Sequence, residues 1–118
     1  MFPRFFAALA FAALAYAQTF GDISGEVKDA SGAVIPQAKV VVTNERTNTS
    51  RETVTNEQGL YRFPSLAPSV YSVRVEASGF RAAVRSGIEL QVQQSASIDF
   101  ALTVGQVSEV LEVSATAG

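Results

Sequence analysis

Hydrophobic and polar residues alternate with a period of two along most of the chain beyond residue 20. The alternation is unbroken from Tyr71 to Ala77, where Ser72, Arg74 and Glu76 separate apolar residues. Successive side chains of a β-strand point to opposite faces of its sheet, so this pattern predicts strands with one buried face. Beyond residue 17, no stretch carries the 3.6-residue apolar stripe that is typical of an amphipathic helix.

Short candidate strands follow one another along the chain, with turn-forming residues between them. They span residues 23–28, 38–43, 51–55, 60–63, 71–77, 88–92 and 96–102, with a short additional candidate at 82–85. Many short strands separated by turns are typical of a β-sandwich. We therefore expect an all-β fold, a single seven-stranded antiparallel β-sandwich with Greek-key connections.

Two turns in the middle of the chain have strong local signals. The first, Asn56-Glu57-Gln58-Gly59, separates the candidate strands at 51–55 and 60–63. Because glycine adopts positive φ at little cost, this turn predicts a β-hairpin with Gly59 in the left-handed region. The second turn is expected at Ala67-Pro68-Ser69.

The first 17 residues have the three parts of a secretory signal peptide. A short start with one positive charge, Arg4, precedes an apolar stretch that ends in the small-residue site Ala15-Tyr16-Ala17. We therefore expect a signal peptide at residues 1–17 and a mature chain that begins at Gln18. The alternative, a membrane anchor, is disfavoured because the apolar stretch would rise only about 20 Å as a helix, against a hydrocarbon core of about 30 Å.

The pattern changes after residue 104. Residues 107–114 favour extended structure, but neither face of a strand there would be cleanly apolar, and small residues follow at 115–118. We expect the sandwich to span residues 18–104 and residues 105–118 to form an extended linker. An additional edge strand at 107–113 is the alternative.

The ordered set of strand and turn residues resembles the carboxypeptidase regulatory-like domain, a prealbumin-like and Cna B-like β-sandwich. The matching pieces are Ser24-Gly25-Glu26-Val27-Lys28-Asp29, Gly32, Ile35-Pro36, Ala38-Lys39-Val40-Val41-Val42, Thr55, Gly59-Leu60-Tyr61-Arg62-Phe63, Leu66, Tyr71-Ser72-Val73-Arg74-Val75 and Ser78-Gly79-Phe80. The resemblance covers residues 23 to about 102. It implies a β-sandwich without peptidase apparatus, because in carboxypeptidases this module accompanies the catalytic domain.

A narrower resemblance is to the N-terminal extension of TonB-dependent outer-membrane receptors, particularly the Oar-like group, where a signal peptide precedes one such sandwich. The segment Glu109-Val110-Leu111-Glu112-Val113-Ser114-Ala115 resembles the energy-coupling TonB box of these receptors. The resemblance implies that this segment binds the C-terminal domain of TonB by strand addition, and that a plug and barrel are encoded downstream. It also implies a location in the periplasm or outer membrane of a Gram-negative bacterium.

The composition excludes several kinds of chemistry. The 118 residues include no histidine and no cysteine, which removes Ser-His-Asp and Cys-His nucleophile systems and the usual zinc sites. The net charge is −2 and the basic residues are scattered, which argues against binding of nucleic acid. We therefore expect neither enzymatic activity nor a cofactor.

Two further kinds of site have only partial support. Calcium could use Asp22, Glu26 and Asp29, but their spacing lacks the D-x-D-x-D pattern, and the same holds for the pair Asn56 and Glu57. These residues are therefore expected to be solvated. The second site is an isopeptide cross-link between Lys28 and Asp99, as in similar adhesin sandwiches. Both positions alternate with apolar neighbours and should face water, which disfavours that reaction.

Two functions remain compatible with the sequence. The first is a non-catalytic periplasmic interaction domain of a TonB-dependent receptor, and the second is a free-standing secreted sandwich that binds a polysaccharide or another protein. Sugar-binding surfaces usually present exposed aromatic rings. The alternation instead points four aromatic residues inward, namely Tyr61, Phe63, Tyr71 and Phe100. Only Phe20 and Phe80 are candidates for exposure. The DNA sequence beyond the codon for Gly118 would distinguish the two functions.

Overall fold

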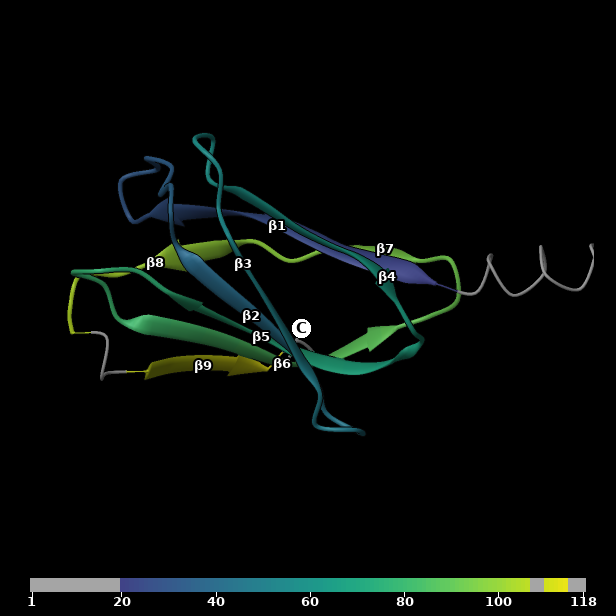
Figure 1. The fold of residues 1–118 in the computed structure, drawn as a ribbon. Helices are drawn as coiled ribbons and strands as arrows, with labels where there is room; N and C mark the ends of the chain where they lie inside the picture. Colours follow the sequence, from purple (N-terminus) through teal and green to yellow (C-terminus); the bar gives the residue numbers. More distant parts are fainter. Residues whose placement is uncertain (1–19, 107–109, 115–118) are drawn as a thin grey trace, which may run out of the picture.

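The computed structural model describes residues 20–106 and 110–114, so the predicted cleavage residues Ala15, Ala17 and Gln18 lie outside the described residues. The described chain is all β (Figure 1). Its strands are β1 (Gly21–Asp29), β2 (Lys39–Asn44), β3 (Ser50–Val54), β4 (Leu60–Leu66), β5 (Ser69–Glu76), β6 (Ala82–Leu90), β7 (Ser95–Ser97), β8 (Phe100–Leu102) and β9 (Val110–Ser114). A helix that could cross a membrane is not found within the described ranges.

The strands form two sheets that face each other across a hydrophobic core (Figure 1). One sheet has the order β4-β1-β7, with β8 also paired to β1, and the other has the order β3-β2-β5-β6-β9. The core draws side chains from both sheets. The four aromatic residues expected to point inward are all buried in it: Tyr61, Phe63, Tyr71 and Phe100. Phe20 is 48% exposed, whereas Phe80 packs partly buried against the core.

The facing predicted from the alternation in Tyr71–Ala77 is confirmed by burial, whereas Val92, expected on the apolar face with Ile88 and Leu90, is exposed. In β5, Val73 and Val75 are fully buried, whereas Arg74 between them is partly exposed. Thr55 is a buried polar side chain just after β3. Its hydroxyl donates a hydrogen bond to the Ile35 carbonyl oxygen at 2.7 Å and accepts one from the Ala38 N–H at 2.9 Å. This hydroxyl therefore satisfies two buried backbone groups in the segment that leads into β2.

The prediction of seven antiparallel strands is wrong in both number and direction. The described residues contain nine strands; β7 and β8 run parallel to β1, and β9 runs parallel to β6. Residues 82–90 form one strand that continues past an irregularity near Gly87, which has a φ of 70°. Residues 96–102, expected to form one strand, are divided between β7 and β8. Alternation identifies buried side chains, but it carries no information about the direction of a neighbouring strand.

The predicted hairpin at Asn56–Gly59 is also wrong, although the turn itself is confirmed. Gly59 has the expected positive φ of 75°, and the Asn56 side-chain oxygen accepts hydrogen bonds from the N–H groups of Gln58 and Leu60 at 3.0 Å. However, β3 pairs with β2, whereas β4 pairs with β1 in the other sheet. The turn therefore carries the chain from one sheet to the other. The hairpin prediction fails because local turn chemistry does not determine which strand becomes the partner.

Candidate functional site

The segment that resembles a TonB box includes β9, at the edge of the five-stranded sheet. Five of its seven predicted residues form the strand, namely Val110, Leu111, Glu112, Val113 and Ser114, while Glu109 and Ala115 lie outside the described residues. The strand pairs in parallel with residues 82–86 of β6, with Ala82 opposite Val110 and Ser86 opposite Ser114. Residues 110–114 thus form an edge strand, close in position to the edge strand at 107–113 that was the alternative to a linker.

Backbone pairing is the main described attachment of β9 to the sandwich. Val110 is 48% exposed and Leu111 is 45% exposed, and neither belongs to the buried core. The Glu112 carboxylate accepts a hydrogen bond from the Ser86 hydroxyl at 3.2 Å on the exposed surface. The strand is therefore ordered by β6 while the side chains of Val110 and Leu111 remain within reach of another chain.

A second candidate surface is a shallow groove of about 620 Å³ against the sheet that contains β1. Its lining combines small, polar and apolar side chains with carboxylates and one guanidinium. The lining residues are Ser24, Gly25, Glu26, Val54, Asn56, Leu60, Tyr61, Arg62, Ser97 and Asp99. Such a lining can form hydrogen bonds with a polar ligand or with a peptide.

One lining residue of the groove, Gly25, is packed so closely that no side chain would fit, and the sequence assigned it to no site. A Cβ atom at this position would lie 1.8 Å from the Ile98 carbonyl oxygen and 2.8 Å from the Tyr61 hydroxyl oxygen. The Tyr61 hydroxyl donates a hydrogen bond to the same carbonyl at 2.5 Å, and burial raises the pKa of Tyr61 above its ordinary value. A glycine inside a strand is the one sequence signal that could have indicated this close backbone approach.

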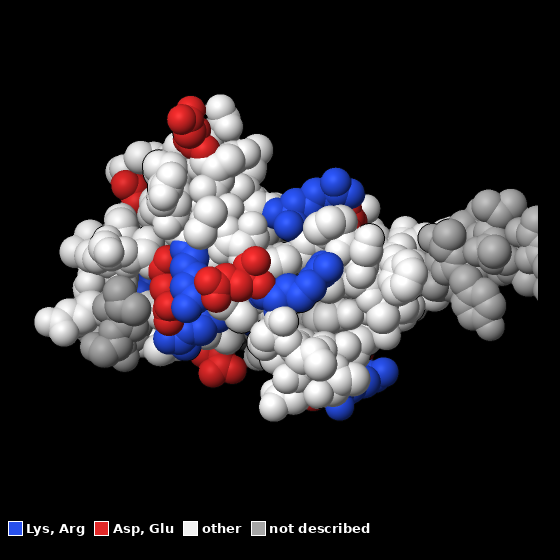
Figure 2. All heavy atoms as spheres, in the orientation of Figure 1, with Lys and Arg blue, Asp and Glu red and all other residues white. Residues whose placement is uncertain are grey.

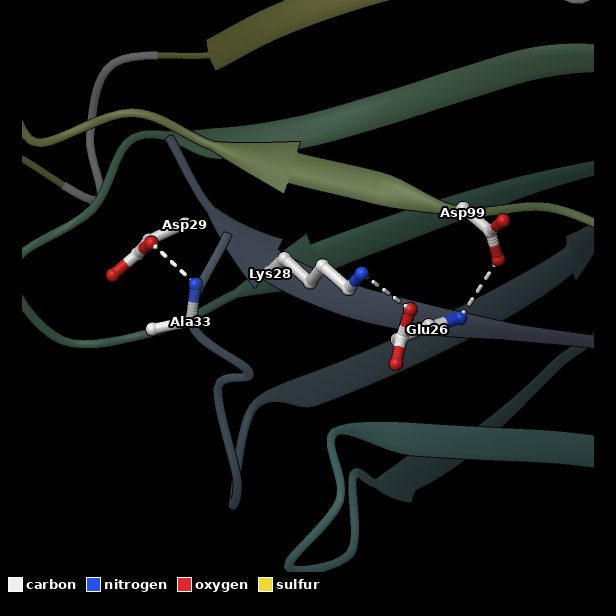
Figure 3. A network of polar contacts seen from close by, with 5 residues as sticks. All are labelled: Glu26, Lys28, Asp29, Ala33 and Asp99. Atoms are coloured by element: carbon white, nitrogen blue, oxygen red, sulfur yellow. Dashed lines mark hydrogen bonds and ion pairs between the residues drawn. The ribbon is translucent and has the colours of Figure 1, made fainter. Parts of the chain in front are cut away.

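Two lining residues, Glu26 and Asp99, take part in the polar contacts drawn in Figure 3. The Glu26 N–H donates a hydrogen bond to Asp99 Oδ1 at 2.9 Å, and the Glu26 carboxylate lies 3.2 Å from the Lys28 ammonium. The Lys28 side chain is 45% exposed, and Asp99 is exposed. Lys28 and Asp99 thus both contact Glu26, Lys28 through the Glu26 carboxylate and Asp99 through the Glu26 backbone N–H, but without the apolar enclosure that an isopeptide bond needs.

The acids considered for calcium are engaged in separate contacts. Asp22 pairs with Arg62 at 3.1 Å and Glu26 pairs with Lys28, whereas Asp29 accepts hydrogen bonds from the Ser31 hydroxyl and from nearby backbone N–H groups. The bond from the Ser31 hydroxyl is the largest cause that lowers the pKa of Asp29 below its ordinary value. Within the described ranges, no group of three or more metal-ligating residues comes together.

Charges of both signs are mixed on the surface. On the face in Figure 2, acidic and basic side chains lie next to one another rather than in one basic region. The described ion pairs are Lys28–Glu26, Lys39–Glu52, Arg62–Asp22 and Arg74–Glu76. Pairs at the surface typically contribute about 1 kcal/mol or less each, so they add little to the stability of the fold.

Solved structures with a similar fold come from proteins of different kinds. The TIE protein of Bacillus anthracis has a TM-score of 0.61 and 14% identity, with 73% of this chain and 18% of that protein covered. Catechol 1,2-dioxygenase from Pseudomonas arvilla C-1 has a TM-score of 0.56 and 14% identity, with 75% and 53% covered. At such low identity, these likenesses show a shared fold and carry no conclusion about activity.

Sequence comparison is more specific. The TonB-dependent transporter Oar of Myxococcus xanthus is 36% identical over 109 residues, which make up 91% of this chain and 10% of the transporter. The chain therefore spans about a tenth of the length of that relative. The family model of the carboxypeptidase regulatory-like domain matches residues 22–103, which comprise both sheets apart from β9 and the first residue of β1. The chain therefore belongs to the carboxypeptidase regulatory-like domain family.

Proposed function

We propose that this chain is a non-catalytic interaction domain at the N-terminal end of a TonB-dependent outer-membrane receptor. In this proposal, the signal peptide at residues 1–17 directs export, and the sandwich lies in the periplasm of a Gram-negative bacterium. The segment at 109–115 binds the C-terminal domain of TonB, and a plug and barrel belong to the same receptor.

The observation that carries the proposal is the position of β9. A segment that resembles a TonB box follows the sandwich and lies at a sheet edge, where Val110 and Leu111 are nearly half exposed. Exposed strand edges are the usual sites at which a strand of another chain adds to a sheet. The 36% identity to a TonB-dependent transporter across 91% of this chain supports the same assignment.

A non-catalytic role is supported by the chemistry of the chain. The sequence has neither histidine nor cysteine. The phenol of Tyr61 is buried and bonded to a backbone carbonyl, and Asp22 and Glu26 are held in ion pairs. These groups have structural partners, so they are poorly placed to act as a nucleophile or general base.

The binding experiment uses two matched proline variants. The wild-type chain, Leu111→Pro and Val54→Pro are titrated with the purified TonB C-terminal domain by isothermal titration calorimetry. Both substitutions place proline, which lacks an N–H, on an edge strand of the same sheet, β9 in one case and β3 in the other. We expect wild type and Val54→Pro to bind and Leu111→Pro not to bind. Absence of wild-type binding would remove the proposed function.

The groove beside β1 supports a second candidate function, recognition of a polar ligand or a protein by a free-standing module. It offers the side chains of Ser24, Asn56 and Arg62, but its only described aromatic lining residue, Tyr61, is buried. Stacking on a sugar ring therefore has little support from this surface. A glycan-array screen of wild type and Arg62→Ala tests this function, since binding that depends on Arg62 would favour it.

A further inference from the structure

The described strands leave four sheet edges open, and three of them carry features that discourage pairing with another chain. The edge strand β3 contains the charged residues Arg51 and Glu52. The edge strand β4 contains Pro64, which has no N–H, and Ser65, which has a φ of 59°. The third edge is divided between β7 and β8, which have three residues each.

The fourth edge, β9, has the fewest of these features, with one charged residue. Its sequence from Val110 to Ser114 contains no proline and no basic residue, and none of these residues has a positive φ. The strand has five residues, and its one acid, Glu112, is hydrogen-bonded to Ser86 of β6. Of the edges in the described part of the chain, β9 is therefore the one best suited to accept another strand.

We infer that TonB pairs with the free edge of β9 while β9 remains paired with β6. This inference rests on the proposed function, and it specifies how that binding occurs. The partner strand would extend the sheet in the order β3-β2-β5-β6-β9-TonB. Backbone groups along a strand point alternately to its two sides, so pairing with β6 uses one set and leaves the other set free.

Two observations favour this mode over release of β9 from the sandwich. Release would unpair residues 82–86 of β6 and uncover its edge, where Ala82 is fully buried and Ala83 is 8% exposed. In addition, β6 already holds β9 in an extended conformation, so binding does not have to order a flexible segment. A docked β9 is thus a preorganised template, whereas a released β9 would bind only after these contacts were lost.

A reversible cross-link distinguishes the two modes. Val84 and Glu112 are directly opposite each other across β6 and β9. Neighbouring strands are about 4.8 Å apart, within the range that a disulfide spans. The chain has no cysteine of its own, so Val84→Cys with Glu112→Cys gives a single, defined pair. The reduced form of the same variant is the matched control, because it has lost the same two side chains.

We expect the oxidised and reduced forms to bind the TonB C-terminal domain with dissociation constants that agree within about threefold, since the docked strand is already in its binding conformation. Binding by the reduced form and loss of binding on oxidation would overturn the inference, because TonB would then require a released β9. If neither form nor the wild-type chain binds, the proposed function itself fails. The melting temperature of each form verifies that the sandwich is folded.

A peptide of residues 109–115 provides an independent comparison. If β9 binds while docked, the whole chain should bind at least about tenfold more tightly than the peptide, which must be ordered on binding. If β9 must first be released, the peptide should bind more tightly than the whole chain, and the inference is overturned. A scrambled peptide of the same composition measures non-specific binding.

Discussion

The backbone N–H of Glu26 donates its hydrogen bond to the side chain of Asp99, at 2.9 Å, where β1 would otherwise pair with a continuous strand. On one side of this contact Ser24 pairs with Ser97, and on the other Val27 pairs with Phe100, so the register is the same on both sides. The Asp99 carboxylate therefore bridges the interruption between β7 and β8 without a shift in register.

Removal of this carboxylate should weaken the sandwich modestly. Asp99→Ala leaves the Glu26 N–H without its acceptor at the junction of β7 and β8. The expected loss in the free energy of unfolding is about 1 kcal/mol, the usual net value of one hydrogen bond. Urea unfolding of the variant provides the measurement. Asp99→Asn, which retains a side-chain oxygen, serves as the control and should lose less.

Gly25→Ala should be much more damaging than its size suggests. The added methyl group would lie 1.8 Å from the Ile98 carbonyl oxygen, so β1 or the segment after β7 would have to move. We expect a loss of about 3 kcal/mol or more in the free energy of unfolding. The neighbouring change Ser24→Ala should have little effect in the same urea titration. Equal stability of the two variants would contradict the close approach.

The two faces of β5 should respond differently to the same charge. Val73→Asp places a carboxylate where the side chain is fully buried and should cost several kcal/mol, enough to unfold a domain of ordinary stability. Arg74→Asp breaks a partly exposed ion pair with Glu76 and should cost about 1 kcal/mol. Thermal melts of both variants provide the test, and similar melting temperatures would mean that the facing is wrong.

Acid should weaken the fold partly through Asp29. Its pKa is lowered in the folded state, chiefly by the Ser31 hydroxyl, so the folded protein holds this proton less strongly than the unfolded chain. The resulting stabilisation is present above the ordinary pKa of 3.8 and is lost as the pH falls through the lower folded value. Asp29→Asn should therefore show a shallower fall in unfolding free energy below pH 3.8, measured by urea titration. An unchanged slope would contradict this contribution.

Export should produce a shortened chain. The Ala15-Tyr16-Ala17 site predicts cleavage before Gln18 when the protein is expressed in a Gram-negative host. Intact-mass spectrometry of the periplasmic fraction should give the mass of residues 18–118, with or without cyclisation of the terminal glutamine. Ala17→Arg should block cleavage and serves as the control. Exported protein that retains Met1 would exclude this site.

The sequence predicted the facing of most strands well, because burial follows the alternation of side chains directly. It could not predict the partners. The turn at Asn56–Gly59 has the same local chemistry whether it closes a hairpin or joins two sheets. Likewise, the extended strand at Val110–Ser114 is held by pairing with β6, and local sequence propensity carries no information about that distant partner. The close approach of β1 to the Ile98 carbonyl is indicated locally only by Gly25.

The central position of β1 has a consequence for the order in which the protein folds. β1 is the first strand in the described chain, yet it pairs with β4, β7 and β8, and its contact with Asp99 spans 73 residues. During synthesis, which starts at the N-terminus, this sheet cannot be completed until the residues of β7 and β8 have been made. The β2–β3 and β5–β6 pairs in the other sheet join strands that follow each other in the sequence, so they close shorter loops and should form first. The N-terminal strand should therefore complete its sheet late, after the local pairs of the other sheet have formed.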